Sequence, residues 1–193
     1  MRGFLRAIVL LLAWTQSARA HAPIEGVGGF YGGLLHPVLV PAHALGLLAL
    51  GLFIARQESR RSPILIFAAA LVAGLGAIAL AVGPTPAAEI LLANTVVVGA
   101  LVAIAFAPPR PVGWLAATVT GATLGLDSPP DEISIALGTL ALIGTALGAC
   151  VALALVIGLT ARVRRDWQRL GVRILGSWIA ASAMLVLAAR LAR

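Results

Sequence analysis

The stretch ISIALGTLALIGTALGACVALALVIGLTA, residues 133–161, runs for 29 positions without a charged residue, between Glu132 and Arg162. Its apolar residues are continuous and do not alternate with polar ones, which argues against a half-buried strand. About 20 apolar residues in a helix span the roughly 30 Å hydrocarbon core of a bilayer. Because backbone polar groups in lipid must be satisfied within one segment, this stretch predicts a transmembrane helix.

Five further apolar runs lie upstream and downstream of this stretch, separated by charged loops or by proline-containing breakers. Gly83-Pro84-Thr85-Pro86, Pro108-Pro109-Arg110-Pro111 and Ser128-Pro129-Pro130 are such breakers, because proline cannot continue a helix. We therefore predict an all-α membrane protein, a bundle of six transmembrane helices in one domain over residues 21–193. The predicted spans are 34–55, 63–82, 89–107, 112–128, 133–161 and 172–191.

The composition supports a membrane environment. Hydrophobic residues make up 61% of the 193 positions and charged residues 11%, whereas soluble domains carry about 25% charged residues. A soluble fold of this size could not cover so much apolar surface, so membrane lipid is an expected partner. All 14 basic residues are arginines, and they form short clusters between apolar runs. This pattern favours determinants of membrane topology over a nucleic-acid-binding surface.

Residues 1–20 are typical of a signal peptide. Arg2 and Arg6 give a positive start, residues 7–14 are apolar, and Ala18-Arg19-Ala20 is a small-x-small cleavage site. The apolar part is too short to cross a bilayer. Cleavage after Ala20 would leave His21 at the mature N-terminus, whereas without cleavage the segment would be an amphipathic anchor.

Charge in the connections predicts the orientation of the helices. The first, third and fifth connections carry a net positive charge from arginines, while the second has no charge and the fourth has three acids. Cytoplasmic loops of membrane proteins are enriched in arginine. We therefore expect the odd connections in the cytoplasm and the mature N-terminus in the periplasm, in the inner membrane of a bacterium.

Two histidines in the first predicted span are candidate metal ligands. His36 and His43 lie seven residues apart, on nearly the same helix face but roughly 10 Å apart along a regular helix. Pro41 cannot donate a hydrogen bond to the carbonyl of Pro37, which predicts a kink or an opening between the histidines. The site would then hold one ion after local unwinding, or two ions in succession. Alternatively, His36 only marks the helix entrance at the membrane surface.

Other ionisable residues at membrane depth are also functional candidates, because such residues are costly in lipid. Glu89 begins the third span and Asp127 ends the fourth. Asp131 and Glu132 are explained equally well by the dipole of a helix N-terminus. His21, as a new N-terminus, would offer an amine and an imidazole together. Imidazole suits nickel, cobalt, copper and zinc.

The stretch HPVLVPAHALGLLALG, from His36 to Gly51, resembles the first-helix signature of the HupE/UreJ family, HPxxGxDHxxxMxxVG. PAAEILLANTVVVGAL is similar to the third-helix pattern of that family and places Glu89 on its acidic position. RLGVRILGSWIAASAMLVLA is similar to the last helix. The resemblance, which covers nearly the whole chain, implies a nickel or cobalt permease of hydrogenase or urease systems, with metalloenzyme-maturation proteins as partners and self-association as an alternative.

The chain departs from this pattern at several positions. Val40 and Ala42 replace the Gly and Asp of the signature, Leu47 replaces its Met, and GATLGLDSPP lacks the histidine expected near the end of the fourth span. Either a reduced set of His36, His43, Glu89 and Asp127 forms the metal path, or the chain is a divergent member that no longer moves nickel.

Two functions remain from the sequence. The first is a secondary permease for a divalent transition metal, with no permanently bound cofactor and no ATP-binding GxxxxGK[ST] motif. The second is a non-transporting accessory or scaffold protein of the same family. An enzyme is not expected, because the chain contains no GxSxG, HExxH or CxxCH motif.

Overall fold

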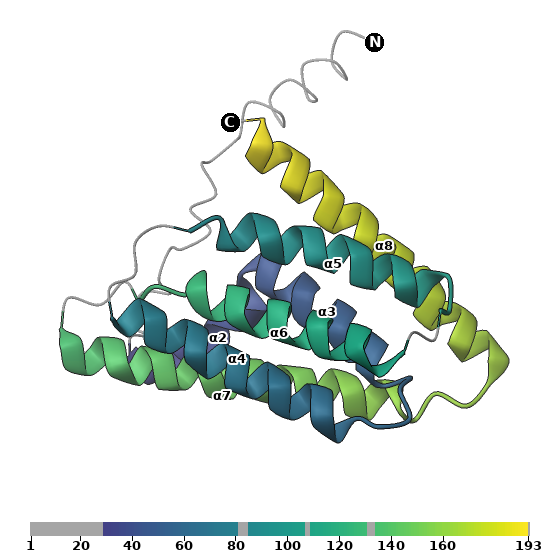
Figure 1. The fold of residues 1–193 in the computed structure, drawn as a ribbon, viewed down its shortest axis with the longest axis horizontal. Helices are drawn as coiled ribbons and strands as arrows, with labels where there is room; N and C mark the ends of the chain where they lie inside the picture. The colour runs from purple at the N-terminus through teal and green to yellow at the C-terminus, as the bar shows by residue number, and fades with distance from the viewer. Residues whose placement is uncertain (1–28, 81–84, 107–108, 131–133, 193) are drawn as a thin grey trace, which may run out of the picture.

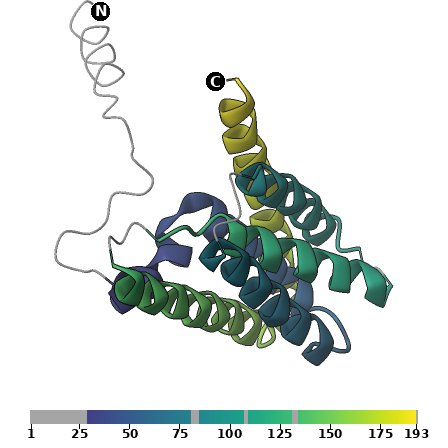
Figure 2. The same ribbon diagram turned by 60° about the vertical axis from the view of Figure 1, so that its left-hand side comes forward.

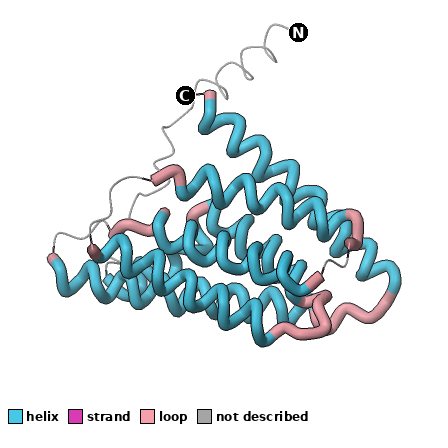
Figure 3. Tube along the Cα trace, in the orientation of Figure 1, coloured by secondary structure: helices cyan, strands magenta, loops and turns pink. Residues whose placement is uncertain are grey.

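The computed structural model describes residues 29–80, 85–106, 109–130 and 134–192, and every regular element in these ranges is a helix (Figures 1 and 3). The predicted signal peptide and His21 lie outside the described residues. The seven helices are α2 (Gly29–Leu39), α3 (Pro41–Ile54), α4 (Arg61–Ala79), α5 (Ala87–Ala103), α6 (Arg110–Leu126), α7 (Ile135–Thr160) and α8 (Asp166–Leu191). The all-helical prediction is confirmed for the described part of the chain.

Each of the six predicted apolar segments corresponds to a helix, except that the first is divided into α2 and α3. Local capping explains where several helices begin. The Ser134 hydroxyl accepts a hydrogen bond from the Leu137 amide, which fixes the start of α7. Helix α8 begins at Asp166, earlier than the predicted residue 172, because the Gln168 side chain accepts from the amides of Arg164 and Arg165.

Helices α2 and α3 meet at an angle of 66°. Val40, between them, has extended backbone angles of φ −81° and ψ 115°. A residue before proline is disfavoured in the helical region, and Pro41 has no amide hydrogen to continue the hydrogen-bond series of α2. The kink predicted between the two histidines is confirmed, and it is a break of the helix rather than a gentle bend.

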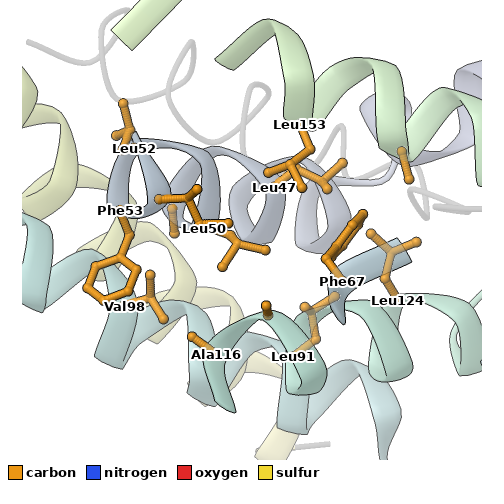
Figure 4. Close-up of a cluster of buried hydrophobic side chains, with 14 of the residues drawn as sticks. Leu47, Leu50, Leu52, Phe53, Phe67, Leu91, Val98, Ala116, Leu124 and Leu153 are labelled. Atoms are coloured by element: carbon orange, nitrogen blue, oxygen red, sulfur yellow. The ribbon is translucent and has the colours of Figure 1, made fainter. Parts of the chain in front are cut away.

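Helix α3 forms the centre of the molecule. Most of its side chains are buried, from Ala42 in its first turn to Ile54 at its end. Figure 4 shows its leucines and Phe53 within a ring of side chains from other helices, including Phe67 of α4 and Leu153 of α7. Because α3 touches α2, α5, α6, α7 and α8, its buried residues are held from several sides.

The outer helices pack in three close pairs, α2 with α7, α4 with α6, and α5 with α8 (Figures 1 and 2). Glycines make the close approach possible in each pair. A Cβ atom on Gly125 of α6 would lie 2.7 Å from the Leu71 carbonyl oxygen of α4, and one on Gly176 of α8 would lie 2.9 Å from the Gly99 carbonyl oxygen of α5. On α7, Gly144 and Gly148 lie directly against the backbone of α2.

The arginine-bearing connections gather at one end of the molecule. Residues from the α3–α4, α5–α6 and α7–α8 connections line a common pocket there. Near the N-terminus of α5 and the C-terminus of α8, Glu89 and Arg190 form an ion pair of 3.6 Å. The side-by-side position of the three odd connections is the arrangement that the charge pattern predicts.

Helices α4, α7 and α8 are long and apolar enough to cross a membrane, and α2 and α3 together make a fourth if they count as one bent span. Their outward faces carry large apolar side chains. Leu65 of α4, Leu155 of α7 and Trp178 of α8 are each 60% exposed or more. Exposed apolar surface on this scale is typical of contact with lipid rather than water.

Candidate functional site

The break between α2 and α3 places two imidazoles together. On a regular helix the seven-residue spacing would separate His36 and His43 by roughly 10 Å. In the structure their ring centroids lie 5.1 Å apart, with the ring planes at 62°. A metal ion bound by both side chains needs this proximity. The chain therefore brings together the pair that a straight helix would keep apart.

Asp127 joins the pair from a different helix. Its Oδ2 atom lies 2.9 Å from Nε2 of His43, across 84 residues of sequence. Asp127 is the residue that ends α6, and its backbone amide donates to the Thr123 carbonyl. A carboxylate is unfavourable at a helix C-terminus, but here it faces His43 in the first turn of α3, where the helix dipole favours negative charge.

The hydrogen bond to Asp127 uses one ring nitrogen of His43 and leaves the other available to a ligand. A carboxylate accepts, so the Nε2 atom of a neutral His43 carries the proton and donates it to Asp127. The Nδ1 atom then holds a lone pair. His43 is completely buried, and Nδ1 has no hydrogen-bond partner among the residues described. A metal-binding histidine commonly donates its other ring nitrogen to a carboxylate, which fixes its orientation and raises its basicity.

The two histidines differ in exposure. His36 on α2 is half-buried, whereas His43 on α3 is fully enclosed. His36 therefore lies nearer the edge of the molecule, and His43 lies nearer its centre. Among the described residues, no group of three or more His, Cys, Asp or Glu side chains has the geometry to hold a metal ion. The ligands that this site offers are thus two imidazoles, with Asp127 orienting one of them.

Glu89 lies in the first turn of α5, and its carboxylate pairs with Arg190 of α8. Both side chains are one-third exposed. The structure gives Glu89 this arginine as its ionic partner and does not place it with the two histidines. His21, the remaining metal candidate from the sequence, lies outside the described residues. Of the four candidates that lie in the described part of the chain, His36, His43 and Asp127 come together and Glu89 does not.

We expect Glu89→Gln to leave metal uptake within about twofold of that of the unchanged chain. The reason is that the Glu89 carboxylate pairs with Arg190 of α8 and not with the two histidines. Loss of this partly exposed ion pair should cost about 0–1 kcal/mol of stability. The measurement is metal accumulation in expressing cells alongside thermal unfolding of the purified protein. A severe loss of metal uptake, with the variant present at the normal protein level, would instead mean that Glu89 takes part in metal transport.

Polar side chains near the site also join helices in ways that the sequence does not reveal. The Asn94 amide of α5 donates to the Thr120 hydroxyl of α6 at 2.9 Å. Gly46, one turn beyond His43, lies against Leu91 and Thr95 of α5. These contacts fix α5 and α6 around the first half of α3. Asn94 between apolar residues was a signal for such a bridge, but its partner is 26 residues away.

Comparison with protein families gives a match over residues 9–186 to the model described as HupE / UreJ protein. The match spans nearly the whole chain, including α2 to α7 and most of α8. The chain belongs to the HupE/UreJ family. This family is associated with membranes and implicated in nickel or cobalt uptake or in accessory roles. Comparisons with curated proteins and with solved structures gave no match.

Membership in the HupE/UreJ family confirms the resemblance seen in the sequence. The segment that carried the resemblance, His36 to Gly51, contains the helix break and both imidazoles. Val40, which stands in place of the signature glycine, is the residue at the break. Ala42, in place of the signature aspartate, is buried in the first turn of α3. The carboxylate that bonds His43 belongs instead to Asp127, at the C-terminal end of α6.

Proposed function

We propose that this chain is a secondary permease for a divalent transition metal, with nickel or cobalt as its cargo. The observation that carries the proposal is the buried Nδ1 atom of His43, which has no hydrogen-bond partner in the described part of the chain, on a ring whose centroid lies 5.1 Å from that of His36. Borderline metal ions such as nickel and cobalt accept imidazole nitrogen readily. Broken helices with ionisable residues are a common location for ion sites in transporters.

Transport by this route would use His36 first and His43 second. His36 is the more exposed of the two and would receive the ion, which then passes to Nδ1 of His43. Asp127 would hold the His43 ring and offset part of the positive charge of the ion. Two imidazoles bind more weakly than a full set of four ligands, and a transport site must also release its ion. Energy would come from the membrane potential, worth about 2.3 kcal/mol per charge per 100 mV.

The proposed permease has six spans in the inner membrane, with its odd connections in the cytoplasm. Helices α5 and α6, of 17 residues each, are about 25 Å long, slightly less than the roughly 30 Å core of a bilayer. Local thinning of the bilayer accommodates a short span at modest cost. The gathering of the arginine-bearing connections at one end supports this orientation.

A second candidate function is a non-transporting accessory protein of the same family. It is favoured by the lack, among the described residues, of any group of three or more side chains able to hold a metal. In that case the histidine pair would be a packing element of α3.

Metal uptake separates the two functions. Cells that express the chain should accumulate nickel or cobalt above cells with an empty vector, and a His36→Ala/His43→Ala chain should return to the vector level. Zinc and copper measured in parallel give the selectivity. No uptake of any of the four metals, by protein shown to be folded in the membrane, would support the accessory function.

A further inference from the structure

A second feature of the molecule is a pocket that four arginines line and that includes neither histidine of the candidate metal site. The pocket has a volume of about 490 Å³, within the range of roughly 300–1,000 Å³ that is usual for small-molecule sites. Its basic residues come from two parts of the chain, the α3–α4 connection and the start of α8. They are Arg56, Arg60, Arg169 and Arg173. No acidic residue is among the residues that line it.

Two of these arginines are fixed by the end of α5. Arg56 donates to the Val102 carbonyl at 3.1 Å, and Arg173 donates through Nε to the Ala103 carbonyl at 2.9 Å. Helix α5 stops here because Ala105 takes a left-handed conformation with φ 56°. The exposed carbonyls of the helix end thus hold two guanidinium groups side by side. Each guanidinium has five N–H groups, so most of its donors remain for another acceptor.

The close approach of the two guanidinium groups is unfavourable in the absence of an anion. Burial against the helix ends, together with the positive charge of Arg173, lowers the pKa of Arg56 below its ordinary value. Arg169 pairs with Asp166, at 3.8 Å and with both side chains widely exposed, which compensates little of the charge in the pocket. An anion bound between the arginines would offset the repulsion directly.

We propose that this pocket binds a phosphate group, as carried by the headgroup of an anionic phospholipid or by free phosphate. Guanidinium groups match the geometry of phosphate oxygens and form paired hydrogen bonds with them. The pocket opens where three helix connections meet, at the end proposed to face the cytoplasm. Arginine-lined pockets between helices on the cytoplasmic side of a membrane are suited to anionic lipid headgroups. The proposal is independent of metal transport.

The test uses the purified full-length protein and two matched double variants. Arg60→Gln/Arg169→Gln removes two pocket charges that, unlike Arg56 and Arg173, make no hydrogen bond to the end of α5. Arg162→Gln/Arg164→Gln removes two charges from the same region of the chain that do not line the pocket. Each protein is extracted with neutral detergent from bilayers of equal phosphatidylglycerol and phosphatidylcholine, and retained lipid is identified by native mass spectrometry. A parallel thermal-unfolding series compares added inorganic phosphate with chloride at equal ionic strength.

We expect the unchanged protein to retain phosphatidylglycerol preferentially. An arginine that contacts the bound headgroup contributes about fivefold to the binding of an anionic lipid, so the pocket variant, which loses two such contacts, should lose on the order of tenfold or more of that preference. The control variant should stay within about twofold. Stabilisation by inorganic phosphate without lipid preference, lost in the pocket variant, would identify free phosphate as the ligand. Equal loss in both variants, or no effect of lipid or phosphate, would overturn the proposal.

Discussion

His43→Gln is expected to abolish metal uptake while the protein still folds. Glutamine can donate its amide hydrogen to Asp127, as Nε2 of His43 does at 2.9 Å in the structure. It therefore keeps the partly buried carboxylate satisfied, whereas alanine would leave that carboxylate without its partner at a cost of about 1–3 kcal/mol. What glutamine lacks is the lone pair of an imidazole nitrogen. The variant thus separates metal binding from stability.

Loss of a carboxylate that hydrogen-bonds and orients a metal-binding histidine typically lowers metal affinity 10–100-fold, and loss of the histidine itself should exceed that range. We accordingly expect uptake in His43→Gln to fall more than about 100-fold, and uptake in Asp127→Asn to fall less. The measurements are initial rates of nickel and cobalt uptake, normalised to the amount of protein in the membrane. Uptake by His43→Gln at the unchanged rate would mean that the His43 imidazole only fills space in the core.

Gly148→Leu is expected to displace α2 from α7 and to reduce both stability and uptake. Gly148 lies directly against the Leu34 backbone of α2, two residues before His36. A leucine side chain cannot fit there unless α2 moves, and overpacking of this kind costs about 1–3 kcal/mol. Movement of α2 also carries the His36 ring away from His43. Thermal unfolding of the purified protein and metal uptake in cells measure the two consequences.

Gly158→Leu on the same helix is the matched control. No heavy atom lies within 4 Å of the position that its Cβ would take, so the added side chain meets open space. We expect its unfolding temperature and its uptake to remain those of the unchanged chain. If the two variants behaved alike, the close contact between α2 and α7 would not be what holds His36 in place.

Local features of the fold could be predicted from the sequence because their causes are local. Apolar runs and proline breakers located the helices to within a few residues. Pro41 predicted the break before α3, since a missing amide hydrogen acts on the carbonyl four residues earlier. The start of α8 was missed by six residues because the largely polar segment from Arg165 to Gln168 forms its own helix cap, which no apolar run marks in the sequence.

Contacts between distant residues could not be predicted in this way. The sequence offered both Asp127 and Glu89 for the metal path and favoured Glu89, because the family resemblance places it on an acidic position. In the structure one carboxylate reaches His43 and the other reaches Arg190. The partners lie far along the chain, and only the packing of α6 on α3 and of α8 on α5 brings them together. Likewise, nothing in the sequence of α7 distinguishes Gly148 from Gly158. In the structure a Cβ atom on Gly148 would clash with the backbone of α2, whereas one on Gly158 would meet open space.

The pairing of α2 with α7 also constrains biosynthesis. The ribosome makes Leu34 long before it makes Gly148, and at about 5–20 residues per second the interval is roughly 6–23 s. During that time the first helical segment has been made but the surface of α7 that holds it does not yet exist. Its polar groups, His36 among them, must meanwhile be tolerated by lipid, water or the insertion machinery. The part of the chain that is translated first among these helices therefore cannot reach its final position until α7 has been made.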